Sequence, residues 1–121
     1  MTDNKILCES DFRFMSVIWE NEPVSSARLV ELCAEKLGWK KSTTYTMIKK
    51  MCEKGFAKSE NATVTSLVPR GEVQTLASEK FIEQTFDGSL PRFLVAFLGG
   101  KTISDEEARE IKRLIDEHRE G

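Results

Sequence analysis

Three segments with helical apolar periodicity, each closed by a helix-breaking residue, constrain this fold more than any other feature. The first ends before Pro23, the second at Gly38 and the third at Gly55. Glycine ends helices readily because it adopts the left-handed backbone without steric cost. A β-branched stretch over residues 63–68 follows, after a turn at Asn61. We therefore expect helix, helix, helix and hairpin in that order.

The apolar residues of these segments recur every three or four positions, which predicts one core-facing stripe on each helix. Ser10 is expected to cap the first helix, Ser25 or Ser26 the second, and a hydroxyl residue between positions 42 and 44 the third. The expected core residues are Phe12, Met15, Ile18, Trp19, Leu29, Val30, Cys33, Leu37, Met47, Ile48, Met51 and Cys52. The plan is that of a winged helix-turn-helix, in which the third helix enters the major groove of DNA.

The remainder, residues 70–121, reads as purely helical, with breaks at Gly88 and Gly99 and a capping box formed by Ser104 and Glu107. Its short helices carry broad apolar faces that cannot all be buried at this length. A second copy of the tail would cover them, so we expect a homodimer. The predicted dimerisation residues are Phe81, Phe86, Leu90, Phe93, Leu94, Phe97, Ile111, Leu114 and Ile115. The chain is thus predicted to be mainly α, with a winged-helix domain over residues 1–69 and a helical dimerisation domain over residues 70–121.

Charge is distributed unevenly along the chain. The net charge is only −2, but residues 36–58 contain seven lysines and one acidic residue, Glu53. The tail from Ser104 onward is rich in Asp and Glu. A basic patch inside an acidic chain is the electrostatic footprint of a nucleic-acid partner.

The third segment offers side chains of the kinds that DNA recognition needs. Hydroxyl and aromatic groups approach base edges and thymine methyls, and lysines reach phosphate oxygens. The candidate DNA-binding residues are Lys40, Lys41, Ser42, Thr43, Tyr45, Thr46, Lys49 and Lys50. A solvated, lysine-rich helix face explains composition alone equally well. The preceding helix, the break at Gly38 and the following hairpin favour the DNA-binding interpretation.

Enzymatic and metal-dependent functions have little support in the sequence. Cys8, Cys33 and Cys52 show no C-x-x-C spacing, and His118 is the single histidine. There is no phosphate loop and no nucleophile–base constellation. We therefore expect no enzyme activity, no cofactor and no metal site. No segment approaches the roughly 20 apolar residues of a membrane span, and no signal peptide is apparent, so a cytoplasmic location is expected.

Several motifs resemble those of the penicillinase-repressor (BlaI/MecI/CopY) family. The segment Trp39–Gly55 resembles the family's recognition helix, W-x-x-x-T-x-x-T-L-L-x-R-L-x-x-K-G. The first helix matches with its Phe12-x-x-Met15-x-x-Ile18-Trp19 spacing, and residues 86–90 match a turn in the family's dimerisation region. The resemblance extends from about Glu9 to about Glu117.

This resemblance implies a homodimeric transcriptional repressor on a pseudo-palindromic operator of double-stranded DNA, with Thr43 and Thr46 as paired recognition threonines. It also implies a membrane-bound sensor metalloprotease as partner, which would cleave Ala96–Phe97. The best-known members have Asn at the position of Ala96, and Phe97 is equally explained as dimer core. The hairpin lacks the family's aromatic and arginine residues, and the C-x-C pairs of the copper-responsive branch are absent. A winged helix used only for protein interaction is the alternative.

Overall fold

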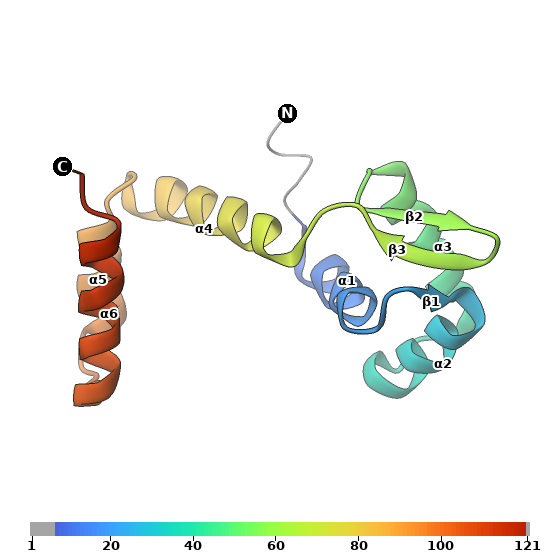
Figure 1. Ribbon diagram of the computed structural model, residues 1–121, viewed down its shortest axis with the longest axis horizontal. Coiled ribbons are helices and arrows are strands. Elements are labelled where there is room, and N and C mark those ends of the chain that lie inside the picture. Colours follow the sequence, from blue (N-terminus) through green and yellow to red (C-terminus); the bar gives the residue numbers. More distant parts are fainter. Residues whose placement is uncertain (1–6, 121) are drawn as a thin grey trace. The chain divides into compact units, whose positions relative to one another are not determined.

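The computed structural model describes residues 7–120, which form two compact units: Met1–Phe81, of which residues 7–81 are described, and Ile82–Gly121, described to residue 120. Figure 1 traces the elements along the chain. Their bounds are α1 Glu9–Asn21, β1 Val24–Ser25, α2 Ser26–Leu37, α3 Lys41–Glu53, β2 Ala57–Glu60, β3 Thr63–Ser66, α4 Arg70–Phe86, α5 Leu90–Leu98 and α6 Asp105–Glu117. The predicted fold class is confirmed: three helices and a small antiparallel sheet precede a helical tail.

The wing is a three-stranded antiparallel sheet in the order β1-β3-β2 (Figure 1). The short β1 pairs with β3 through Val24 and Val64. Asn61 and Ala62 form the two-residue loop between β2 and β3, with φ of 52° and 60°. A two-residue hairpin loop with positive φ at both positions matches the right-handed twist of its strands. The hairpin expected from the β-branched stretch is therefore present.

The helix boundaries confirm some predicted caps and correct others. The Ser25 side chain caps α2 by accepting from the Arg28 N–H at 3.0 Å, and Gly38 ends α2 with φ of 71°. The α1 helix begins at Glu9 instead of Asp11, so Ser10 lies inside its first turn. Likewise α3 begins at Lys41, before the hydroxyl residues expected to cap it.

The hydrophobic core of the first unit lies between α1, α2, α3 and the sheet. Phe14, Val17 and Leu32 are buried there although the one-stripe pattern missed them. The reason is that α1 contacts α2, α3 and β3, so it is covered on more than one side. Val73 of α4 is 1% exposed, which places the start of α4 in this unit. The two compact units divide between Phe81 and Ile82, within α4, and the domain boundary between residues 69 and 70 stays a prediction.

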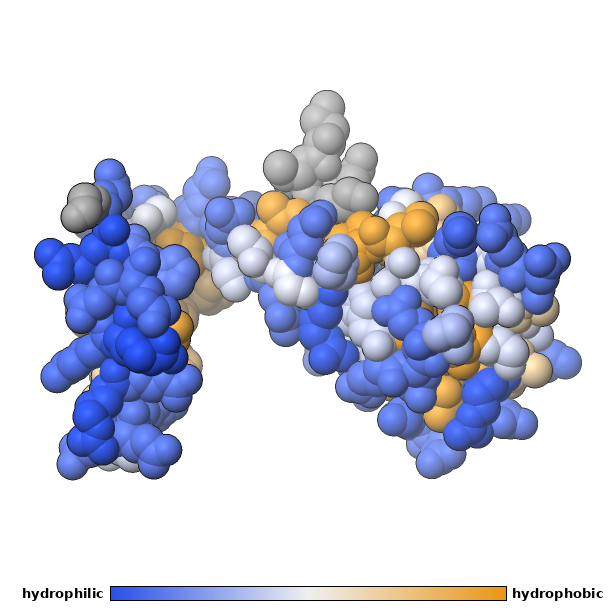
Figure 2. Space-filling view, in the orientation of Figure 1, coloured by the Kyte–Doolittle hydropathy of each residue, from blue (hydrophilic) through white to orange (hydrophobic). Residues whose placement is uncertain are grey.

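The second unit has a different character. Ser89 and Ser104 cap α5 and α6, each accepting from a backbone N–H three residues on, and the predicted cap at Ser104 is thus confirmed. No described residue of α5 or α6 is buried. In the view of Figure 2, α6 presents a largely hydrophilic surface, although Leu114 and Ile115 of this helix are 43% and 49% exposed.

Candidate nucleic-acid interface

The α3 helix divides cleanly into a buried and an exposed face. Thr44, Ile48 and Met51 are buried in the core. The opposite face carries exposed side chains from the predicted set, namely Lys41, Ser42, Thr43, Tyr45, Thr46 and Lys49. Tyr45 is 41% exposed, so part of its aromatic ring is accessible on this face. The structure thus brings hydroxyl, aromatic and cationic groups together on one accessible helix face.

The entry into α3 is fixed by the core. The Trp39 indole stacks on the Phe14 ring with centroids 5.7 Å apart, and the backbone N–H of Trp39 donates to the Cys33 carbonyl at 3.2 Å. Thr44 is fully buried, and its hydroxyl donates back to the Lys40 carbonyl at 3.3 Å. This threonine therefore serves the core, and the exposed pair Thr43 and Thr46 lies three positions apart on the open face.

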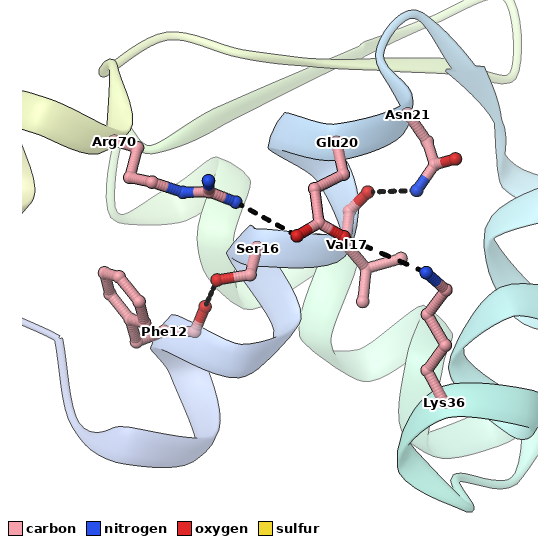
Figure 3. Close-up of polar contacts among 7 residues, drawn as sticks. All are labelled: Phe12, Ser16, Val17, Glu20, Asn21, Lys36 and Arg70. Atoms are coloured by element: carbon pink, nitrogen blue, oxygen red, sulfur yellow. Dashed lines mark hydrogen bonds and ion pairs between the residues drawn. The ribbon is translucent and has the colours of Figure 1, made fainter.

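Four of the seven lysines in residues 36–58 are engaged in ion pairs. Two of these involve exposed glutamates: Lys36 lies 3.8 Å from Glu20, and Lys58 lies 3.4 Å from Glu60 on the wing. Figure 3 shows Glu20 between Lys36 of α2 and Arg70 at the start of α4. These cations are partly neutralised within the protein, and exposed pairs of this kind contribute little to stability.

The other two lysines share one acid. Lys50 donates a hydrogen bond from Nζ to Oδ1 of Asp11 at 3.1 Å, and Nζ of Lys54 lies 3.5 Å from Oδ2. Asp11 is 1% exposed. Local sequence patterns could not predict this contact, because Lys50 and Lys54 lie 39 and 43 positions away from Asp11.

Lys40, Lys41 and Lys49 complete the set. Within residues 7–120, none of the three has an ion-pair partner, and all three are exposed. They flank the exposed threonines at the N-terminal end and in the middle of α3. A face with unneutralised cations beside short hydroxyl groups is suited to phosphate and base-edge contacts on DNA.

Two of the three cysteines, Cys33 and Cys52, have the environment of structural groups. Burial raises the pKa of the Cys33 thiol, with a weaker opposing hydrogen bond from Thr44. Burial also raises the pKa of Cys52, reinforced by the charge of Glu53. A raised pKa keeps the thiol protonated and unreactive at neutral pH. Cys8 is exposed, and the described part of the chain contains no cluster of residues suited to a metal ion.

The fold and this surface define a winged-helix transcription regulator with a helical tail. The chain belongs to the penicillinase repressor family, which matches residues 7–117. It is 20% identical over 117 residues to the penicillinase repressor of Bacillus licheniformis, covering 93% of this chain and 91% of that protein. It is also 26% identical over 110 residues to an uncharacterized 16.5 kDa protein in the ptsI 3′ region of Latilactobacillus sakei, covering 88% and 75% of the two chains.

Membership of this family makes the chain a regulatory protein of the transcriptional repressor type and agrees with the resemblance drawn from the motifs. The family is regulatory and not enzymatic. Among the residues the structure describes, no helix has the length and apolar character required to cross a membrane.

Proposed function

We propose that the protein is a sequence-specific DNA-binding repressor that binds a pseudo-palindromic operator as a homodimer in the cytoplasm. The observation that carries the proposal is the exposed face of α3, where three lysines without an ion-pair partner among residues 7–120 flank exposed hydroxyl groups. In a winged helix this is the helix that enters the major groove. Its opposite face is packed into the core, so the exposed face is held rigidly for recognition.

The residues of this face divide by role. Lys40, Lys41 and Lys49 contact phosphates and set the register of the protein on the duplex. Thr43 and Thr46 read base edges through their hydroxyls or thymine methyls. Ser42 and Tyr45 lie on the same face and extend the contact surface.

A homodimer is supported by the apolar surface of the tail. Exposed residues from the predicted dimerisation set are Phe81, Leu90, Phe97, Leu114 and Ile115, at 43–54% exposure. The remaining members, Phe86, Phe93, Leu94 and Ile111, are half-buried. Val95 at 75% and Ile103 at 38% extend the apolar surface beyond the predicted set. An exposed surface of this kind marks an interface, and a two-fold dimer buries the same patch on both copies.

Relief of repression would follow from cleavage of Ala96–Phe97 by a membrane-bound sensor metalloprotease. Both residues are exposed and lie near the end of α5, within three residues of Gly99. A helical peptide bond must unwind locally before a protease accepts it, and helix ends unwind most readily. Incubation of the full chain with such a protease, followed by mass spectrometry, would show fragments ending at Ala96; cleavage elsewhere would contradict this assignment.

The decisive experiment is a gel shift of the full chain against DNA from its own upstream region at two salt concentrations, with the mass in solution measured in parallel. We expect a specific shift by a dimer, with affinity in the range of about 10⁻⁸–10⁻¹¹ M and weaker binding at the higher salt. A dimer that ignores DNA even at low salt would overturn the proposal and favour a winged helix that binds proteins.

Thr46→Ala tests the base-reading role of the exposed face. Loss of a base-edge contact costs about 1–3 kcal/mol of discrimination at one base pair. Selection from a randomised operator library should therefore return a site relaxed at one position in each half. Ser59→Ala, which removes an exposed hydroxyl from the wing, is the matched control and should return the unaltered site. An unchanged site with Thr46→Ala would contradict the assignment.

A further inference from the structure

We propose that Asp11 is a positioning residue that withholds Lys50 from DNA phosphates, so that α3 presents less charge to DNA than its sequence contains. The inference rests on the proposed DNA-binding function and adds a specificity-determining residue to it. Asp11 lies on α1, outside the helix that contacts DNA. It acts only through the lysines it holds.

The geometry defines a small charge cluster between α1 and α3. Each carboxylate oxygen of Asp11 faces one ammonium group, Lys50 at 3.1 Å and Lys54 at 3.5 Å. The Asp11 side chain is 2% exposed, whereas the two lysine side chains are 44% and 42% exposed. The Asp11 carboxylate is therefore enclosed by protein, while each lysine side chain that contacts it remains partly exposed to solvent.

Because Asp11 is buried and Lys50 is partly exposed, loss of their contact costs the carboxylate more than it costs the lysine. A carboxylate out of water is costly unless cations and hydrogen-bond donors compensate it. Among the described residues, Lys50 supplies the one hydrogen bond to the Asp11 carboxylate, and Lys54 adds a longer charge contact. If Lys50 moved to a phosphate in solvent, the carboxylate would lose its hydrogen bond. A phosphate would give Lys50 a new partner but leave this buried carboxylate without its hydrogen bond, which costs free energy.

Lys49 provides the contrast within the same helix. It precedes Lys50 in the chain, is exposed, and has no ion-pair partner in the described structure. The two lysines are identical in chemistry and differ in what holds them. Lys49 is free to displace counterions from DNA, and Lys50 is not.

The consequence concerns specificity. Phosphate contacts strengthen binding to every sequence, so each additional one raises non-specific affinity. A repressor whose Lys50 is held by Asp11 binds non-specific DNA more weakly. Its affinity for the operator then depends more on the threonines of its recognition face. Asp11 would thereby widen the ratio between operator and non-specific affinity.

The test measures the salt dependence of binding to operator and to unrelated DNA for single variants of the full-length protein. The logarithm of affinity falls with the logarithm of salt with a slope of about 0.9 per phosphate contact. Lys49→Ala should lower this slope by about 1, and Lys50→Ala should leave it within about 0.3 of the wild-type value. Equal reductions by the two variants would overturn the proposal.

Asp11→Asn gives the reciprocal measurement. The substitution keeps the shape of the side chain and releases Lys50 together with Lys54. Lys50 is the one of the two that belongs to the candidate DNA-binding set, so the slope should rise by about 0.9, equivalent to about 3.5-fold more affinity lost between 50 and 200 mM salt. Its matched control is Glu53→Gln, which removes one negative charge from the exposed surface of α3 without releasing a lysine. In the Asp11→Asn background, Lys50→Ala should now lower the slope by about 1.

The outcomes separate the inference from the function on which it rests. Wild-type protein without affinity for any DNA would overturn both. Wild-type binding with a normal slope, but identical behaviour of Asp11→Asn and Glu53→Gln, would overturn the role of Asp11 alone. If Asp11→Asn does not fold, the comparison of Lys49→Ala with Lys50→Ala in the unaltered chain still decides.

Discussion

The two compact units use their apolar side chains in opposite ways. The first encloses Phe14, Ile18, Leu29 and Met51 within the contacts of α1, α2, α3 and the sheet. The second leaves Leu90, Phe97 and Leu114 half exposed on short helices. The first unit buries its apolar residues within one chain, whereas the second leaves an apolar surface that the proposed homodimer would cover. One sequence thus specifies a unit with its own closed core and a unit with an open apolar surface, and substitutions can perturb each of them separately.

The first prediction concerns the hydrophobic core of the first unit. Phe14 is fully buried and stacks on Trp39, so Phe14→Ala should cost about 3–5 kcal/mol of stability through the cavity it leaves. Both tryptophans, Trp19 and Trp39, lie in the first unit. Urea unfolding followed by tryptophan fluorescence therefore reports on this unit, and its midpoint should fall sharply.

The control for this prediction is Phe97→Ala, which truncates a 52% exposed ring in the second unit. It should leave the tryptophan transition unchanged. If Phe97→Ala shifted that transition as much as Phe14→Ala does, the two units would not be energetically separate and the comparison would fail.

The second prediction concerns the exposed apolar surface of the second unit. Leu114→Asp places a charge on the apolar face of α6, and burying it in a dimer interface should cost about 3 kcal/mol or more, over a hundredfold in the dimer dissociation constant. Analytical ultracentrifugation should show a monomer with an intact tryptophan transition. Lys112→Asp, at an exposed polar position of the same helix, should remain dimeric. A dimeric Leu114→Asp protein would exclude this face from the interface.

The same contrast explains how much could be predicted from the sequence. Helix order, the ends at Gly38 and Gly88 and the caps at Ser25 and Ser104 follow from local chemistry, because the residues that decide them are neighbours in the chain. The buried face of α3 was also predictable, since the periodicity of Ile48 and Met51 is local. These features needed no knowledge of the rest of the molecule.

Features that depend on distant residues were not predictable. From the sequence, Asp11 is an ordinary residue near a helix start, because none of its neighbours in the chain indicates that Lys50 and Lys54 form ion pairs with it. Lys50 was assigned to phosphate for the same reason, and the contact with Asp11 now sets it apart from Lys49. Phe14 and Val17 were missed as core because one apolar stripe was expected where α1 is covered on several sides.

The smallest predicted effect gives the sharpest comparison, because the same local interaction occurs once in each unit. Ser25 and Ser104 both accept from a backbone N–H three residues on, each at 3.0 Å. Loss of a serine N-cap costs about 0.5–2 kcal/mol. Ser25→Ala should lower the tryptophan-detected stability by that amount at any protein concentration, since α2 is packed within one chain. Ser104→Ala should leave that transition unchanged and weaken the dimer instead. The helical circular dichroism signal of this variant should therefore be lost under milder denaturing conditions, and the more so the further the protein is diluted. If the two alanine variants showed the same dependence on protein concentration, the distinction between a self-contained unit and an assembly surface would not hold.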